Sequence, residues 1–275
     1  QAEDGIRDSV ASRGLGDVYK RQKDKNEIFN EAEKKKDSEL CGLPIAIKDL
    51  SDVVGFPTTY GYSGAKNNKP NKNSFFVDKL LKAGVTVIGK TKTAALGVGG
   101  QTINRLFGPT SNAFDYSKCA AGSSGGASTA VALGMLPFAD GTDQMGSCRG
   151  PAAFANIYGF RPTTGLIASD RSYQHPKIPV LTTPGCFAKT PDDMSLLLDL
   201  VVGSNKSDPL SFDISDKFEN TTLSDKEFSE TKIVILNNLI SSYDFEKGIL
   251  EMFEDKLINL KNYSKVESIN SKRSF

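Results

Sequence analysis

The chain has 275 residues and an almost balanced charge, since 34 Lys and Arg stand against 33 Asp and Glu for a formal net charge of +1. Hydrophobic residues make up 38% of the chain and 25 residues are glycine, which is typical of a globular protein. This balance argues against a disordered chain and against a nucleic-acid binder driven by bulk charge. No apolar run approaches the roughly 18 residues of a membrane-spanning helix. We therefore expect a globular cytoplasmic protein, with neither nucleic acid nor a membrane as its partner.

The counts of cysteine and histidine narrow the chemistry. The four cysteines lie far apart without a paired CxxC spacing, which favours neither a zinc ribbon nor a dense disulfide framework. His175 is the only histidine, so sites with two or three His ligands are excluded and a Ser-His-Asp triad would depend on this one residue. A hydrolase of this composition is expected to activate its nucleophile in another way.

Residues 1–22 differ in character from the rest of the chain. They read QAEDGIRDSVASRGLGDVYKRQ, without the apolar core of a signal peptide or the acid-poor pattern of a transit peptide. The segment resembles translated sequencing-adapter sequence, and its few apolar residues predict a disordered, artefactual tail. The other end, SINSKRSF, lacks the composition of a tail, and we expect the chain to be a fragment that is open at both ends.

The first half of the remaining chain alternates between amphipathic and apolar segments. Residues 23–39 are charged and carry apolar residues at helical spacing, which predicts a short surface helix. The segment LPIAI (43–47) predicts a buried strand. A second helix is expected over 74–83, ending at Gly84, and a second strand over 85–88.

The second half continues this alternation. The stretch GSSGG (122–126) is followed by small helix-forming residues, and Pro191 opens an apolar helix with acids in its first turn. Residues 203–230 are polar and predict a surface excursion, whereas 244–260 place apolar residues on one stripe of a helix. The expected strands here are 136–139, 231–236 and 266–269. Alternating helices and strands predict an α/β sandwich with a central sheet, in one domain over residues 23–275.

The segment GVTVIGKT (84–91) matches the phosphate-loop pattern GxxxxGK[ST]. A phosphate loop needs its four intervening residues to form a tight turn between a strand and a helix. Here those four residues are valine, threonine, valine and isoleucine, which are all β-branched and suit a strand interior. The pattern therefore favours a strand, and a nucleotide-binding protein using 84–91 is kept only as a second alternative.

The chain contains the segments GLPIAIKDL (42–50), AGSSGGA (121–127) and GTDQMGSCRGPAAFANIYGFRPTTGLI (141–167). Together these three segments resemble the amidase signature family of serine hydrolases. Weaker similarities bring the resemblance to roughly residues 40 to 200, in the order that the family has. The resemblance implies an amidase-signature fold, with a central mixed β-sheet flanked by helices that is incomplete at the C-terminus.

The resemblance also implies a Ser–Ser–Lys triad. By motif, Lys48 is the base, Ser123 is the bridging serine held by a cis peptide bond, and Ser147 is the nucleophile. The separation of 24 positions between the two serines accommodates a helix, a strand and a turn, which lets the chain leave the site and return to it.

These residue types make chemical sense by themselves. A serine hydroxyl is a poor nucleophile until a neighbouring base takes its proton, and a neutral lysine can serve if burial lowers its pKa. Lys48 follows the apolar segment LPIAI, which supplies that burial, while Asp49 is expected to point to the opposite face. Ser123 can donate one hydrogen bond while accepting another, and so can relay a proton from Ser147 to the lysine.

The turn before Ser147 is the expected oxyanion hole. Backbone N–H groups of Gln144, Met145, Gly146 and Ser147 should face the developing negative charge. The family usually has two glycines where this chain has Met145-Gly146. If the first of these positions needs a positive φ, a methionine would be strained there.

Three further residues are expected to support the site structurally. Asp143 and Arg149 match a charged pair of the family and should brace the turn that holds the nucleophile, although an ordinary surface pair is the simpler alternative. Gly122 should help the Gly/Ser loop adopt its backbone conformation. Cys148 adjoins the nucleophile but is expected to be a small buried residue.

The sequence therefore predicts an amidase that hydrolyses a carboxylic amide to an acid and an amine or ammonia through an acyl-enzyme. No metal or organic cofactor is implied, the expected substrate is a small-molecule amide, and a homodimer is left open. An alternative is the amidase subunit of a glutamyl-tRNA(Gln) amidotransferase, which shares the triad but passes ammonia to partner subunits.

Overall fold

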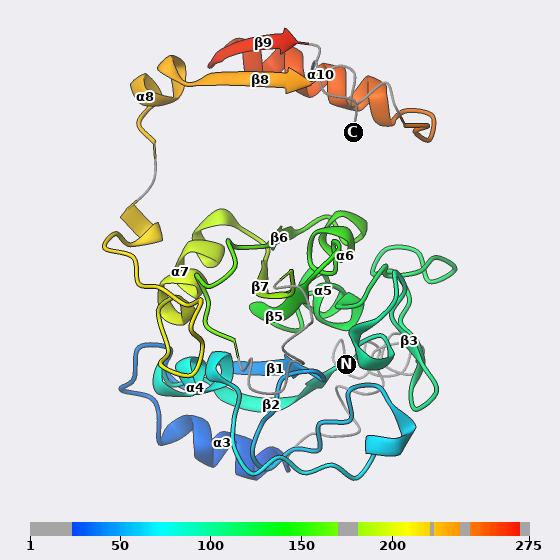
Figure 1. The fold of residues 1–275 in the computed structure, drawn as a ribbon, viewed down its shortest axis with the longest axis vertical. Helices are drawn as coiled ribbons and strands as arrows, with labels where there is room; N and C mark the ends of the chain where they lie inside the picture. Colours follow the sequence, from blue (N-terminus) through cyan, green and yellow to red (C-terminus); the bar gives the residue numbers. More distant parts are fainter. Residues whose placement is uncertain (1–23, 170–180, 221–222, 237–242, 270–275) are drawn as a thin grey trace. The chain divides into compact units, whose positions relative to one another are not determined.

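The computed structural model describes residues 24–169, 181–220, 223–236 and 243–269 (Figure 1). The expected tail over 1–22 and His175 lie outside these residues. The chain divides into two compact units, Gln1–Glu219 and Asn220–Phe275, and each is described by itself. The assignment of 23–275 to one domain stays a prediction. Among the described helices, none is long and apolar enough to cross a membrane.

The first unit begins with a helix and a pair of parallel strands. Asp24 caps the first helix by accepting the N–H of Asn26 at 2.8 Å, and this helix ends six residues before the expected end because the chain turns after residue 33. The two strands pair in parallel and are joined through a helix that buries one apolar face. These elements are α3 (Lys25–Glu33), β1 (Pro44–Lys48), α4 (Phe75–Lys82) and β2 (Thr86–Thr91).

Strand β2 decides the phosphate-loop alternative. Three of the four residues that a phosphate loop would need as a turn, residues 86–88, lie in this strand beside β1. Lys90 is 1% exposed and donates hydrogen bonds to the Ser51 carbonyl and, at 3.1 Å, to the Thr58 hydroxyl. A lysine enclosed in this way cannot reach a phosphate, and the nucleotide-binding interpretation of 84–91 is wrong.

A second sheet of the first unit is antiparallel, with the strand order β5-β7-β6. Parallel and antiparallel strands thus both occur, as expected of a mixed α/β fold, but their backbone hydrogen bonds form separate sheets. Helix α5 packs on β1 and β5, and α7 packs on β7 and α4 (Figure 1). The elements are α5 (Gly125–Ala132), β5 (Phe138–Asp143), α6 (Arg149–Phe154), β6 (Tyr158–Phe160), β7 (Thr183–Ala188) and α7 (Pro191–Val201).

Smaller elements complete this unit. A two-stranded hairpin of β3 (Ile103–Asn104) and β4 (Gly108–Pro109) precedes the Gly/Ser loop. Short 3-10 helices occupy Ser63–Ala65 and Ala95–Gly97, and Phe218–Asn220 forms another where the two units meet in sequence.

In the residues described, the second unit contains a parallel pair of strands and two helices. Its first helix begins with a capping box, in which Ser224 and Glu227 satisfy each other's backbone N–H groups. Its long helix begins at Ile249, not at the expected residue 244, because Gly248 before it has a positive φ of 92°. The elements are α8 (Asp225–Glu230), β8 (Lys232–Leu236), α10 (Ile249–Lys261) and β9 (Lys265–Ile269).

Glycines let α5 approach the neighbouring backbone closely. A Cβ atom at Gly126 would lie 2.5 Å from the Lys92 nitrogen and 2.7 Å from its carbonyl oxygen. A Cβ atom at Gly125 would lie 2.5 Å from the Thr102 hydroxyl. The helix therefore sits against the chain just beyond β2, and this contact sets the position of the Gly/Ser loop at its start.

We expect Gly126→Ala to lower the free energy of unfolding by about 1–3 kcal/mol, because a backbone neighbour cannot move aside as a flexible side chain can. Gly150→Ala is the matched control, since Gly150 also lies in a helix and its added Cβ would meet nothing within 4 Å. Alanine's higher helix propensity should leave the control unchanged or more stable by up to about 1 kcal/mol. Urea unfolding followed by circular dichroism measures both, and equal stabilities would contradict the packing argument.

Candidate active site

Lys48 is the last residue of β1, and its side chain is fully buried. Its Nζ lies 2.9 Å from the Ser123 Oγ, 2.6 Å from the Ser124 Oγ and 2.8 Å from the Thr142 Oγ1. Burial lowers the pKa of Lys48 from 10.5 to about 8, against the opposing charges of neighbouring acidic groups. Asp49 points elsewhere, as expected, and accepts the Thr59 N–H at 3.0 Å.

Three hydroxyl partners fit both protonation states of this amine. A protonated amine donates three hydrogens, whereas a neutral amine donates two and keeps one lone pair. With a pKa of about 8, both forms are present in mildly alkaline water. The neutral form can accept a hydrogen from one of its hydroxyl neighbours, which is what a general base must do.

The Gly/Ser loop presents Ser123 to the lysine. The peptide bond between Gly122 and Ser123 is cis, which confirms the expectation from the sequence. The Ser123 carbonyl accepts the Ala94 N–H at 3.1 Å. A Cβ atom at Gly122 would lie 2.6 Å from the Gln101 carbonyl carbon, so a side chain at Gly122 would collide with the neighbouring backbone.

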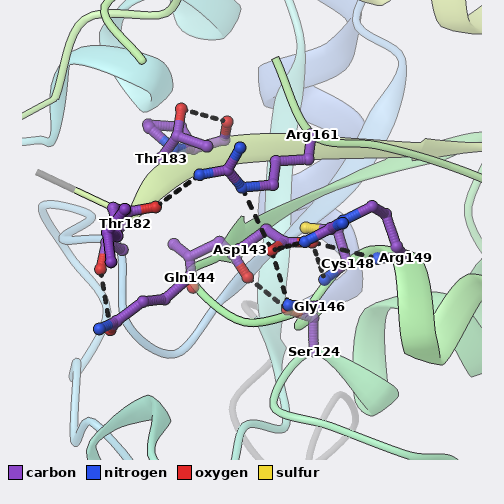
Figure 2. Close-up of polar contacts among 12 residues, drawn as sticks. Ser124, Asp143, Gln144, Gly146, Cys148, Arg149, Arg161, Thr182 and Thr183 are labelled. Atoms are coloured by element: carbon purple, nitrogen blue, oxygen red, sulfur yellow. Dashed lines mark hydrogen bonds and ion pairs between the residues drawn. The ribbon is translucent and has the colours of Figure 1, made fainter. Parts of the chain in front are cut away.

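Ser147 lies half-buried in the turn between β5 and α6. Asp143, the last residue of β5, shapes this turn because its carboxylate accepts the N–H groups of Gly146 at 2.8 Å, Cys148 at 3.1 Å and Arg149 at 3.3 Å (Figure 2). The turn is thus wrapped around one carboxylate.

Two arginines surround the same carboxylate. Arg149 donates to Asp143 from Nε at 3.0 Å and from Nη2 at 2.9 Å, and the Arg161 Nε lies 3.4 Å from Oδ1 (Figure 2). The Asp143 side chain is 0% exposed, which distinguishes this pair from an ordinary surface ion pair. Although burial alone would raise it, the hydrogen bonds from Arg149 and from the backbone lower the pKa of Asp143 to about 2.

The expected oxyanion hole is altered in detail. The positive φ of this turn falls on Gly146, at 107°, and not on Met145, so the strain anticipated for a methionine does not arise. The Gly146 N–H points to Asp143. The N–H groups of Gln144, Met145 and Ser147 make no hydrogen bond within the described part of the chain, and they are the remaining candidate donors.

The structure brings two members of the expected triad into contact. Lys48 and Ser123 are hydrogen-bonded. Among the residues that the structure describes, the Ser147 hydroxyl forms no hydrogen bond with Lys48 or with Ser123. The assignment of Ser147 as the nucleophile and the roles of the three residues stay predictions.

Cys148 is buried, as expected, although it adjoins Ser147. Its sulfur fills a space left by two paired glycines, because Cβ atoms at Gly141 and Gly185 would lie 2.6 Å and 2.8 Å from Sγ. Burial raises the pKa of the Cys148 thiol to about 12. A protonated, enclosed thiol is a poor nucleophile, so Cys148 is unsuited to act as one.

Two partners of Lys48 were missed by the sequence reasoning, namely Ser124 and Thr142. The signal for Ser124 is the second serine of GSSGG, and the signal for Thr142 is its place one residue before Asp143 in GTD. Neither reveals the contact unless the neighbouring strand is known. Thr142 also lines a cavity of about 340 Å³ together with Ser51 and Asp140. Within the described ranges, no group of three or more His, Cys, Asp or Glu could hold a metal ion.

A buried lysine bonded to a serine with a cis peptide is the arrangement that the amidase signature implies. The chain belongs to this family, because the family model described as Amidase matches residues 17–270.

The chain is similar to two curated proteins of different description. A glutamyl-tRNA(Gln) amidotransferase subunit from Methanosarcina barkeri is 36% identical over 186 residues, which cover 68% of this chain and 39% of that protein. An acylamidase of Rhodococcus erythropolis is 40% identical over 178 residues, covering 63% of this chain and 36% of that protein. The chain thus spans well under half of the length of these two relatives.

A solved structure agrees with the fold. The crystal structure of a bacterial aryl acylamidase of the amidase signature family superposes with a TM-score of 0.80 at 26% identity, over 90% of this chain and 53% of that one. The amidase-signature fold expected from the sequence is thereby confirmed.

We expect Asp143→Asn to change how stability depends on pH. A carboxyl group whose pKa is lowered from 3.8 to about 2 stabilises the fold above about pH 4, and that contribution is lost as the pH falls toward about 2. The variant is less stable at neutral pH, and the difference from the wild type narrows on acidification. Urea unfolding at a series of pH values measures it.

Arg149→Met provides the complementary variant, because it keeps the carboxylate and removes its partner. The pKa of Asp143 then rises toward its ordinary value of 3.8, so the variant should be less stable at neutral pH and should lose less stability than the wild type between about pH 4 and about pH 2. If the free energy of unfolding of Asp143→Asn differed from that of the wild type by the same amount at every pH, this role of Asp143 would be contradicted.

Proposed function

We propose that the protein is an amidase that hydrolyses a carboxylic amide through an acyl-enzyme on Ser147. The observation that supports it best is the buried Lys48 amine, with a pKa lowered to about 8, in hydrogen-bond contact with Ser123. A lysine in this state serves as a general base at neutral to alkaline pH. A small-molecule substrate and a cytoplasmic location belong to the same proposal.

In the first half of the reaction, neutral Lys48 accepts a proton from Ser123, which takes the proton of Ser147. The freed Ser147 oxygen attacks the carbonyl carbon, and backbone N–H groups of the preceding turn stabilise the oxyanion. Ser123 then returns a proton to the nitrogen as the C–N bond breaks, and the amine or ammonia leaves. An ester between the acyl group and Ser147 remains.

Water completes the reaction by the same proton route. It gives a proton through Ser123 to Lys48 and attacks the ester carbonyl. The bond to Ser147 breaks, the serine regains its proton, and the carboxylic acid is released. Neither step needs an oxidant, a reductant or an additional group.

Ser147→Ala should abolish both amide cleavage and labelling by a fluorophosphonate in the full-length protein, because the attacking oxygen is gone. Cys148→Ala is the matched control, since it changes the next residue, and it should retain both. Mass spectrometry of the labelled peptide identifies the modified residue.

Labelling that persists in the serine variant would overturn the assignment of the nucleophile. Lys48→Ala should lower the labelling rate by orders of magnitude while the label stays on Ser147, because the base speeds the attack without being its target.

A second candidate is the amidase subunit of a glutamyl-tRNA amidotransferase, which the similarity to the Methanosarcina barkeri protein favours. The two candidates differ in where the ammonia goes. A hydrolase releases it to water, whereas an amidotransferase delivers it to a partner.

We expect the isolated full-length protein to release an amine or ammonia from small amides without any partner protein. An enzymatic ammonia assay over a panel of aryl, alkyl and amino-acid amides, glutamine included, measures this. Ammonia release from glutamine alone, and only when tRNA and partner subunits are added, would favour the amidotransferase.

A further inference from the structure

Asp140 lies in the middle of β5 and is 3% exposed. Its Oδ1 accepts the backbone N–H of Lys48 at 2.6 Å, and its Oδ2 accepts the Ser51 hydroxyl at 3.0 Å. Side chains two residues apart on a strand share a face, which places Asp140 beside Thr142, the partner of the lysine amine. One face of β5 thus contacts both the backbone N–H and the side-chain amine of Lys48.

The Asp140 carboxylate accepts a backbone N–H of β1 that a neighbouring strand would accept in a continuous sheet. Strand β1 pairs through its backbone with β2, and the Asp49 N–H donates to the Thr91 carbonyl on that side at 3.0 Å. The Lys48 N–H points the other way, toward β5, which belongs to a different sheet. A buried N–H without an acceptor costs about 1–3 kcal/mol, and Asp140 supplies that acceptor where the two sheets meet.

Titratable groups that act electrostatically on the Lys48 amine come from several elements. They are Asp140 and Asp143 of β5 and Cys148 in the turn before α6. Asp143 is hydrogen-bonded to Arg149 and forms an ion pair with Arg161. Cys148, with a pKa of about 12, is neutral. The carboxylate without an arginine among its described contacts is Asp140.

Lys90 of β2 also acts on Asp140. Burial raises the pKa of Asp140 above its ordinary value, and the Lys48 N–H, the Lys90 charge and the Ser51 hydroxyl oppose that rise. Lys90 is in register with Ile47, so its side chain leaves the β1–β2 sheet on the face opposite to Lys48. The buried positive charge of Lys90 therefore favours ionised Asp140 without approaching the amine of Lys48.

We propose that Asp140 is a positioning residue for the lysine base, which anchors the main chain of Lys48 and whose negative charge sets the pH at which the amine becomes neutral. This inference rests on the proposed function. A nearby negative charge favours the protonated amine. Removal of the charge lets the amine lose its proton at a lower pH, and the acid limb of the rate profile then moves to lower pH.

The test is the rate of fluorophosphonate labelling of Ser147 between about pH 6 and about pH 10 in the full-length protein. Asp140→Asn keeps an oxygen that accepts the Lys48 N–H and removes the charge. We expect its acid limb to move down by about one pH unit, the size of one charge interaction in a buried site, with the plateau rate kept within a few-fold. Asp140→Leu removes the acceptor as well, and its plateau rate should fall at least about tenfold.

Asp49→Asn is the matched control. Asp49 is equally buried and adjoins Lys48 in sequence, but its carboxylate bonds Thr59. Its acid limb should stay where the wild-type limb is. An unchanged limb in Asp140→Asn, or equal shifts in the two asparagine variants, would overturn the inference while leaving Ser147 labelled. Failure of the wild type to label at Ser147 would instead remove the proposed function.

A second readout does not depend on the reaction. The ¹³Cε resonance of Lys48, assigned by its loss in Lys48→Met, reports the proton affinity of the amine directly. If Asp140→Asn does not fold, Asp140→Asn combined with Lys90→Met removes both buried charges together, an exchange that proteins often tolerate. The Lys48 resonance should titrate at a lower pH than in the wild type, and an unchanged midpoint would contradict the charge role.

Discussion

The first unit of this protein depends on the burial of one amine. A lysine with no exposed surface loses the hydration of its charge, and the surrounding protein has to replace it with hydrogen bonds. Lys48 obtains them from hydroxyl groups of the Gly/Ser loop before α5 and of β5. The cis peptide at Ser123, the glycines at the start of α5 and the register of β5 are each needed to bring these hydroxyls to one point.

Two buried carboxylates near the Lys48 amine have different roles. Asp143 is neutralised by arginines and holds the turn of Ser147, whereas Asp140 holds the strand that ends in Lys48. Both carboxylates come from the same strand, three residues apart. A single short strand thus ties the expected base to the expected nucleophile, although these two are distant in sequence.

Much of this fold could be predicted from apolar patterns. The strand LPIAI and the helix at Pro191 have periodicities that need no partner for their recognition. Strand β5 was predicted over 136–139 only, because FADGTD ends in residues that usually avoid strands. It is nevertheless a strand since tertiary partners satisfy its carboxylates. Strands β6 and β7 and helix α6 were missed for a similar reason, because glycine and proline interrupt them.

The expected site shows the same division. The motifs predicted that Lys48 meets Ser123 and that Arg149 meets Asp143, and the structure contains both contacts. The contacts of Asp140 and Thr142 depend on which strand lies beside β1, and a linear pattern does not contain that information. The sulfur of Cys148, enclosed between two paired glycines, has a practical consequence. A maleimide reaches it after the β5–β7 ladder has separated, while exposed Cys41 reacts at once. The time between the two modifications therefore measures how slowly the β5–β7 sheet opens.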